Sequence, residues 1–83
     1  MNETISYAQL HAALVQLGFR KVVLPSANIQ YRHEASGTSL VFPAHRPEDR
    51  VPAASIIGTR KVVVDRGVAK AELWNELLQA PAA

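Results

Sequence analysis

The chain has 83 residues, a size at which folding buries only roughly 60% of the surface of the unfolded chain, so we expect one domain and no deep pocket for a large cofactor. It contains no cysteine, which excludes disulfides, a thiol nucleophile and cysteine-based metal sites, and favours a location in the cytoplasm. Its formal net charge of +2 is compatible with an acidic partner but too small to indicate nucleic-acid binding by itself.

No segment indicates attachment to a membrane. The N-terminus lacks the basic and then apolar pattern of a signal peptide, and apolar runs such as residues 62–64 are too short to span a bilayer. We therefore expect residues 1–83 to form a single soluble domain with no cofactor and with a short disordered tail over residues 80–83.

A first helix is predicted between Ser6 and Gly18. Ser6 followed by Gln9 three residues later forms a capping-box pattern, and Gly18 is typical of the position just past a helix end. Apolar residues recur between them at helical spacing, at Tyr7, Leu10, Leu14 and Leu17. His11 lies one position away from this stripe, so we interpret it as a solvent-facing histidine with no part in a site.

Three strands are predicted next. Residues 19–24 are rich in β-branched side chains and bounded by turn residues, and residues 28–34 alternate apolar and polar side chains as a half-buried strand does. Residues 38–44 are the expected partner of the second strand. Pro43 lacks a backbone donor, which places it in an edge strand or at the end of a strand.

The turn between the second and third strands decides which residues face each other. We expect a two-residue turn at 36–37, because it sets Tyr31 opposite Phe42 and brings the apolar faces together, whereas a three-residue turn would mix core and solvent sides. The same register places Asn28 opposite His45 on the solvent face. A small polar cluster is expected there, made of Asn28, Gln30, Arg32, His45 and Arg46.

Helical patterns follow the strands. Residues 52–66 keep helical spacing up to Gly67, a typical helix stop. The valine run at 62–64 would also serve as a strand, so the extent of this helix stays open. Residues 69–80 carry an apolar stripe that includes Trp74, which we interpret as core packing and not as a platform for stacking bases.

The predicted fold class is α+β. One helix, a three-stranded antiparallel sheet and one or two C-terminal helices follow each other (α-β-β-β-α-α), and the helices are expected on one face of the sheet. The other face is left open.

Three short motifs occur in residues 10–45. Gly18-Phe19 ends the first helix, Tyr31-Arg32-His33 lies in a strand, and Pro43-Ala44-His45 forms a Pro-x-His ending to the next strand. With this pattern the segment resembles the HicA-type toxins, the YcfA-like mRNA interferases. The resemblance implies a fold of the double-stranded-RNA-binding-domain type, cleavage of messenger RNA, and an antitoxin-like partner protein that covers the active face.

One position departs from the family pattern. Asn28 stands where the resemblance, counted back from Tyr31, expects the catalytic histidine. Metal-free cleavage through the 2′-hydroxyl of RNA needs groups that take and give a proton, and an amide does neither near neutral pH. The resemblance with this substitution implies a catalytically impaired protein.

His45 is the best remaining candidate for acid–base catalysis, with Arg32 or Arg46 to offset the charge that builds on phosphorus. We interpret His33, at the rim of an apolar face, as a structural hydrogen-bonding residue. His11, His33 and His45 have no short-range ligand spacing, so no metal site is expected.

Three functions stay open. The first is an RNA-binding module with phosphate contacts from Arg20, Lys21, Asn28, Gln30, Arg32, Arg46 and Arg50. The second is a weak metal-independent ribonuclease that uses His45. The third is a protein-interaction domain that docks an antitoxin-like protein or a second copy of the chain on its open sheet or edge strand, so the chain is expected as a monomer or a homodimer.

Overall fold

The computed structural model describes residues 5–79. The predicted tail over residues 80–83 and the predicted end of the last helix lie outside this range. The elements are α1 (Tyr7–Gln16), β1 (Arg20–Val23), β2 (Ile29–His33), β3 (Thr38–Phe42), α2 (Ala53–Asp65) and α3 (Ala71–Gln79). This order, α-β-β-β-α-α, confirms the predicted α+β fold.

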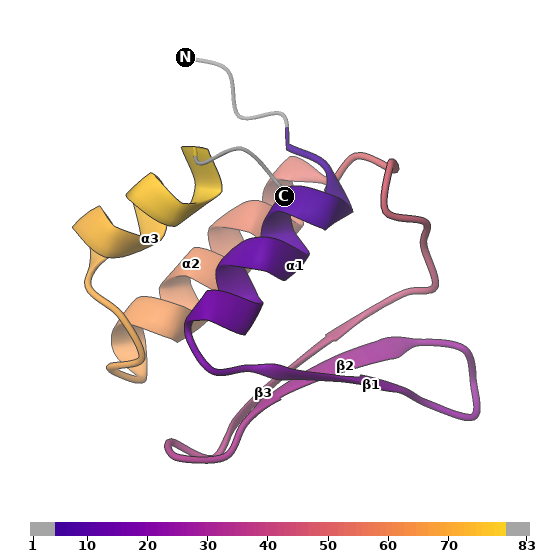
Figure 1. The fold of residues 1–83 in the computed structure, drawn as a ribbon, viewed down its shortest axis with the longest axis horizontal. Helices are drawn as coiled ribbons and strands as arrows, with labels where there is room; N and C mark the ends of the chain where they lie inside the picture. Colours follow the sequence, from indigo (N-terminus) through magenta and orange to yellow (C-terminus); the bar gives the residue numbers. More distant parts are fainter. Residues whose placement is uncertain (1–4, 80–83) are drawn as a thin grey trace.

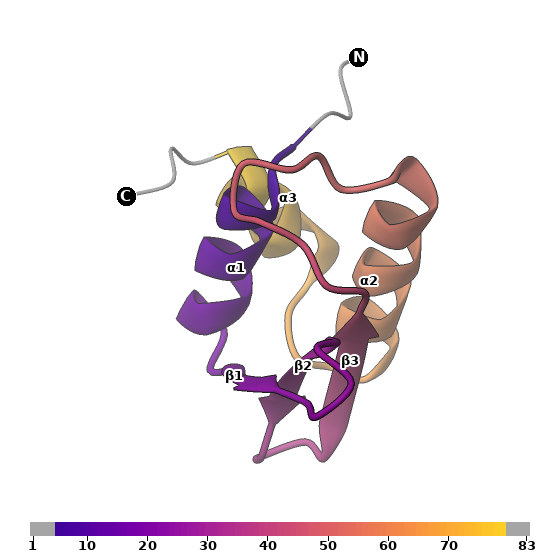
Figure 2. The same cartoon turned by 90° about the vertical axis from the view of Figure 1, so that its right-hand side faces the viewer.

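The strands form one antiparallel sheet in the order β1-β2-β3, and the three helices lie on one of its faces, as predicted (Figure 1). The turned view shows α1 on the side of β1 and α2 on the side of β3 (Figure 2). α3 packs against both of these helices. None of the helices in residues 5–79 is long and apolar enough to cross a membrane.

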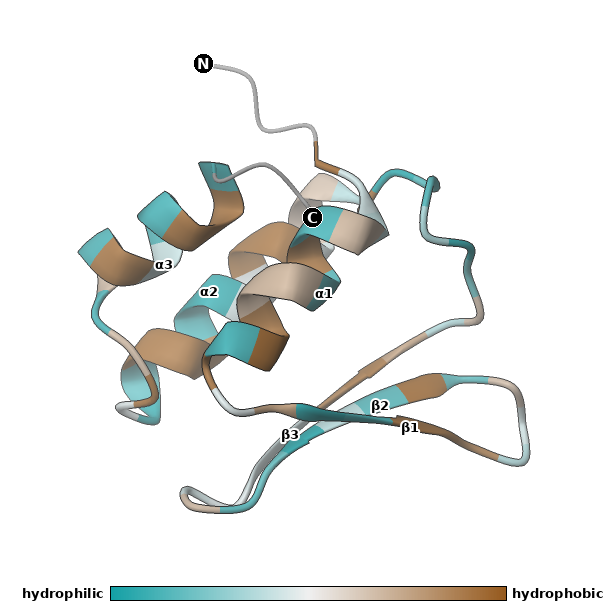
Figure 3. Cartoon of the chain, viewed as in Figure 1, coloured by the Kyte–Doolittle hydropathy of each residue, from teal (hydrophilic) through white to brown (hydrophobic). Residues whose placement is uncertain are grey.

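The core fills the space between the helices and the covered face of the sheet. Trp74 of α3, Leu14 of α1 and Val63 of α2 are all 0% exposed, which confirms Trp74 as a packing residue. Along β3 every second side chain is buried, as expected for a strand with one covered face. Hydrophobic and hydrophilic segments accordingly alternate along the elements, while the loop from β3 to α2 is mainly hydrophilic (Figure 3).

Two local devices set the ends of α1. The Ser6 hydroxyl oxygen accepts a bond from the Gln9 backbone N–H at 3.2 Å, and the Gln9 side chain accepts one from the Ser6 N–H at 3.0 Å, which is the predicted capping box. Gly18 then adopts a φ of +99° as the chain leaves α1 for β1. A Cβ at Gly18 would stand 3.4 Å from the His33 ring, an ordinary contact distance, so it is the backbone conformation that favours glycine here.

The predicted register of β2 and β3 is wrong by two residues. Tyr31 lies opposite Leu40, whereas a two-residue turn at 36–37 would set it opposite Phe42. The chain instead turns through residues 34–37, between the facing ends of the two strands. Because side chains alternate with a period of two, a shift of two residues leaves each side chain on its predicted face and changes only the facing pairs.

Hydrogen bonds within the hairpin explain the longer turn. The Gly37 N–H donates to the His33 carbonyl at 2.9 Å. The Ser36 hydroxyl lies 2.7 Å from His33 Nδ1 and 2.7 Å from the Thr38 hydroxyl. His33 and Ser36, three residues apart, therefore hydrogen-bond each other within the turn, and this bond stabilises a four-residue turn.

The valine run at 62–64 belongs to α2 and not to a strand. Pro52 is the N-cap residue, so the helix begins at Ala53, one residue later than predicted. α2 buries Ile56, Thr59 and Val63 against the core. Such packing of one face supplies most of a helix's stability in a folded protein and outweighs the weak helix propensity of valine.

We expect Gly18→Ala to destabilise the fold by about 1–2 kcal/mol, because a left-handed backbone is unfavourable for any residue with a Cβ. Gly58→Ala in α2 is the matched control: nothing lies within 4 Å of an added Cβ there, and alanine is the better helix former by about 1 kcal/mol. Urea unfolding of both variants and the parent chain measures the two changes. A Gly18→Ala variant as stable as the parent chain would contradict this account of the α1–β1 turn.

Candidate functional site

A cleft of about 250 Å³ opens between α1 and the β1 side of the sheet, and we term it the α1 cleft. Residues from four segments line it. They are Tyr7, Ala8, His11 and Ala12 of α1, Lys21 of β1, Tyr31 of β2, and His45 and Pro47 of the loop after β3.

Local geometry explains why these residues meet. The four α1 residues lie on one face of the helix, because residues three to four apart in an α-helix are neighbours on its surface. Lys21 is paired with Tyr31 across β1 and β2, and directly opposed residues point to the same face of a sheet. Lys21 and Tyr31 therefore both project towards α1.

The loop after β3 is anchored to the start of α1. The Tyr7 N–H donates to the Asp49 carbonyl at 2.9 Å, and the Ala8 N–H donates to the Pro47 carbonyl at 2.9 Å. These first-turn N–H groups have no partner within the helix itself. The loop satisfies them and in doing so brings His45 over the cleft.

His11 lies in this cleft, so the predicted solvent-facing placement of this residue is wrong. It is half-buried, and its Nδ1 lies 2.7 Å from the Tyr31 hydroxyl. When Nδ1 carries the ring proton and donates it to the Tyr31 oxygen, Nε2 is the bare nitrogen that can accept a proton from a ligand. The sequence does not indicate this placement, because His11 lies outside the apolar stripe of the helix and its partner Tyr31 is distant in the sequence.

Burial sets the protonation of the pair. It lowers the pKa of His11 from its ordinary value of 6.5, and the nearby positive charges of Lys21 and His45 lower that pKa further. Burial also raises the pKa of the Tyr31 hydroxyl. At neutral pH the imidazole of His11 is therefore neutral and can accept a proton, while Tyr31 keeps its own.

His45 stacks on Tyr7. The ring centroids lie 3.6 Å apart with an interplanar angle of 9°. His45 Nδ1 lies 2.9 Å from the Pro43 carbonyl oxygen, and since a carbonyl only accepts hydrogen bonds, Nδ1 carries the proton. Nε2 is the nitrogen left to take or give a proton, and the loop fixes its position. The predicted candidate His45 thus shares a cleft with a second histidine.

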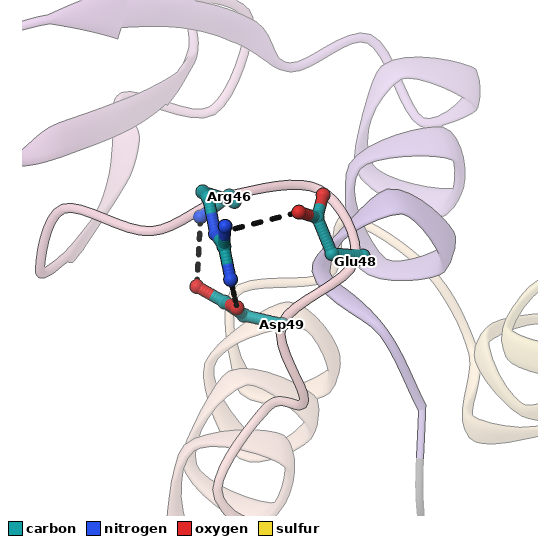
Figure 4. Close-up of polar contacts among 3 residues, drawn as sticks. All are labelled: Arg46, Glu48 and Asp49. Atoms are coloured by element: carbon teal, nitrogen blue, oxygen red, sulfur yellow. Dashed lines mark hydrogen bonds and ion pairs between the residues drawn. The ribbon is translucent and has the colours of Figure 1, made fainter.

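Of the predicted contact residues, Lys21 lies in the cleft with His45 and Arg46 does not. Arg46 pairs with Glu48 at 3.3 Å and with Asp49 at 3.7 Å, and its backbone N–H donates to Asp49 at 2.9 Å (Figure 4). Two carboxylates therefore offset the charge of this arginine. Arg50 follows in the same loop, where its backbone forms an isolated β-bridge with Ser6.

Arg20, Gln30 and Arg32 lie on the open face of the sheet. Arg20 is paired with Arg32 across the strands. Their neighbours Lys21 and Tyr31 point to the helices, so the two arginines point to the opposite face. Arg20 also pairs with Glu34 at 3.3 Å, where both side chains are well exposed. The predicted cluster of Gln30 and Arg32 with His45 is not formed, because His45 lies on the side that α1 covers.

Asn28 lies in the turn from β1 to β2. Its carbonyl accepts the Leu24 N–H at 2.8 Å, and it is not among the residues that line the α1 cleft. The predicted pairing of Asn28 with His45 is wrong, because the strands are paired only as far as Ile29 and Phe42. The position where the resemblance expects a catalytic histidine is thus separate from the cleft that holds two histidines.

His33 points to the hairpin turn and not to the cleft, in agreement with its interpretation as a structural residue. Its Nδ1 lies 2.7 Å from the Ser36 hydroxyl, and its ring centroid lies 5.1 Å from that of Phe19.

Within residues 5–79 no group of three or more potential ligand side chains could hold a metal ion.

Comparison of the chain with protein-family models, with curated proteins and with solved structures finds no match. Membership of the HicA-type toxins therefore stays a prediction from the three short motifs. The function of the α1 cleft is therefore inferred from the side chains that line it.

We expect the imidazole of His11 to titrate with a midpoint below 6.5, for the reasons of burial and charge given above, and NMR titration of its ring protons measures this. Because the unfolded chain takes up this proton more readily than the folded one, the free energy of unfolding should fall as the pH is lowered through 6.5. His11→Gln should weaken that pH dependence. A midpoint at or above 6.5 would contradict the burial of His11 in the cleft.

Proposed function

We propose that the chain binds RNA, with a phosphate of the backbone held in the α1 cleft. The observation that carries this proposal is that the cleft joins the ammonium group of Lys21 with the imidazoles of His11 and His45. Cationic and hydrogen-bond-donating side chains that converge on one small cleft suit a phosphodiester, and contacts of this kind supply most of the affinity for a nucleic acid.

A half-buried aromatic ring in the same cleft favours RNA with unpaired bases. This ring is His45, which stacks on Tyr7, whereas Tyr7 and Tyr31 are themselves buried. Single-stranded RNA is commonly bound by a cationic groove combined with aromatic rings on which bases stack. Because the chain has no cysteine, the cytoplasm is the compartment that fits this function.

A second function, metal-independent cleavage of the bound RNA, is favoured by the presence of two histidines in one cleft. In this reaction His11 Nε2 takes the proton of the 2′-hydroxyl, and the 2′-oxygen forms a bond to phosphorus. The bond from phosphorus to the 5′-oxygen breaks, and that oxygen takes a proton from Nε2 of a protonated His45. The products are a 2′,3′-cyclic phosphate and a 5′-hydroxyl.

The surroundings of each ring support these roles. The lowered pKa of His11 keeps its imidazole neutral and able to accept a proton. The Pro43 carbonyl accepts the Nδ1 proton of His45, so Nε2 is the nitrogen of this ring that exchanges a proton with the substrate. Lys21 supplies a fixed positive charge close to the phosphorus, where negative charge increases in the transition state.

With this acid and base, the asparagine at position 28 does not prevent catalysis. The resemblance implies impaired catalysis because an amide replaces a histidine at this position. The proposed acid and base both come from other segments of the chain, so an asparagine outside the α1 cleft does not remove them.

Loss of the Lys21 charge should weaken RNA binding. We expect Lys21→Gln to make the plot of log affinity against log salt concentration less steep by about 0.7, the value for one phosphate contact on a single strand. Fluorescence anisotropy of a labelled single-stranded RNA over a salt series measures this slope. Arg46→Gln is the control, since two carboxylates already offset that charge. Equal effects of the two substitutions would contradict a phosphate site at Lys21.

Loss of either cleft histidine should suppress cleavage. We expect His11→Gln and His45→Gln each to lower the rate by about 10²–10⁴-fold, the usual contribution of acid–base catalysis. His33→Gln, which changes the histidine outside the cleft, is the matched control, and Asn28→His should leave the rate unchanged. Gel analysis of RNA products in the presence of a chelator, over a pH series, measures the rate and detects the cyclic phosphate. A rate increase in Asn28→His would instead favour a site at the family position.

A further inference from the structure

A second groove lies on the other edge of the sheet, between β3 and α2. It has a volume of about 300 Å³ and is lined by four consecutive residues of the strand region, 40–43, and by four residues of the helix, Ser55, Gly58, Thr59 and Val62. Neighbouring residues of a strand point to opposite faces. A groove that all four strand residues line therefore runs along the edge of β3 and not over one of its faces.

The outer edge of β3 is free for pairing. Within residues 5–79 β3 bonds only to β2, because the sheet order is β1-β2-β3, and β3 lies beside α2 at the end of the sheet (Figure 2). An edge strand presents a row of backbone N–H and C=O groups that can pair with another strand. The neighbouring Val41 is 54% exposed, so apolar surface accompanies this free edge.

The helix side of the groove has room for side chains. Its four lining residues recur at spacings of three and four, which places them on one face of α2. Nothing lies within 4 Å of a Cβ added at Gly58. In a strand added beside β3, every second side chain would point to α2, and one of them can lie over Gly58.

The groove continues into a cationic end. A second hollow of about 490 Å³ shares Val62 with it and is lined by the first residues of β3 and by Lys61, Asp65 and Arg66 of the α2 end. Lys61 pairs with Asp65 at 2.9 Å. Arg66 donates to the Thr38 hydroxyl at 3.3 Å and to the Ser36 carbonyl at 3.2 Å, and both acceptors are neutral. Two cations and one carboxylate leave this end positive.

We propose that this groove binds an extended peptide of a partner protein as a fourth strand beside β3, with alternating apolar side chains and with acidic residues at the end that meets Lys61 and Arg66. Pairing of a peptide with a sheet edge provides affinity through the backbone, and the pockets for alternate side chains provide specificity.

Charge distinguishes this occupant from two others. A second copy of the chain would bring the same positive end and the same net charge of +2, so it offers no complementary charge. RNA suits the cationic end but not the apolar part next to Val41, Phe42 and Val62. The groove shares no lining residue with the α1 cleft, and the proposal does not rest on RNA binding.

Two synthetic peptides test the proposal, because the direction of the added strand is not fixed by the groove. Ac-VTVTVDE-NH2 places its acidic end beside the start of β3 if it runs antiparallel, and Ac-EDVTVTV-NH2 does so if it runs parallel. We expect one of them, added at millimolar concentration to the full chain, to shift the backbone amide NMR signals of Thr38–Phe42 and of α2 but not those of the α1 cleft. Ac-VPVPVDE-NH2, which lacks alternate N–H groups, should not.

Matched variants locate the contact. Gly58→Leu, which fills the groove, should weaken peptide binding about tenfold or more, as expected for one excluded apolar side chain, while Ala54→Leu on the exposed side of the same helix should not. Lys61→Gln should weaken binding more than Arg60→Gln, which changes an exposed cation outside the groove. If Gly58→Leu does not fold, the second pair of variants decides.

Three results would overturn the proposal. The first is that neither acidic peptide shifts the signals of β3. The second is that a single-stranded RNA shifts them in place of the peptides. The third is that the chain alone shows concentration-dependent shifts along β3, which would assign the groove to a second copy.

Discussion

The α1 cleft depends on one hydrogen bond that joins α1 to the sheet, between a buried tyrosine hydroxyl and a histidine. Tyr31 lies in the middle of β2, is 2% exposed, and packs its ring edge-to-face with Phe42 at 5.9 Å. A buried hydroxyl without a hydrogen bond is costly, and His11 of α1 supplies the bond at 2.7 Å. This bond fixes how α1 sits on the sheet. It also holds an imidazole beside Lys21, because Lys21 is the strand partner of Tyr31.

The elements of this chain are predictable because local signals agree with one another. The capping box at Ser6, the alternation along β2 and the stop at Gly67 each specify a boundary within one or two residues. The facing pairs of β2 and β3 are not predictable in this way. Registers two residues apart bury the same side chains, so hydrophobicity cannot separate them, and the bond between Ser36 and His33 that decides the outcome involves polar groups.

The residues of the α1 cleft are even less predictable from the sequence than the strand register. His45 is suggested by the sequence, whereas His11 is not, because only the folded chain brings the flank of α1 over the inner face of β2. Alternation along the strands predicts Asn28, Gln30 and Arg32 as the neighbours of His45. The chain leaves that pattern after Phe42 and crosses back over α1, so alternation no longer indicates which side Arg46 or His45 occupies. The Tyr31 hydroxyl, which the alternation of β2 places on the buried face, is a signal in the sequence that a polar partner is needed there.

The anchoring of the loop after β3 to the first turn of α1 determines when the cleft is assembled during folding. Tyr7 and Ala8 give their N–H groups to carbonyls of Asp49 and Pro47, which lie far from them in the sequence. Such long-range closure carries a larger entropic penalty than the local hairpin. Local opening of this loop would carry the His45 ring away from Tyr7 while the core around Trp74 stays packed, so the cleft can come apart without unfolding of the whole chain.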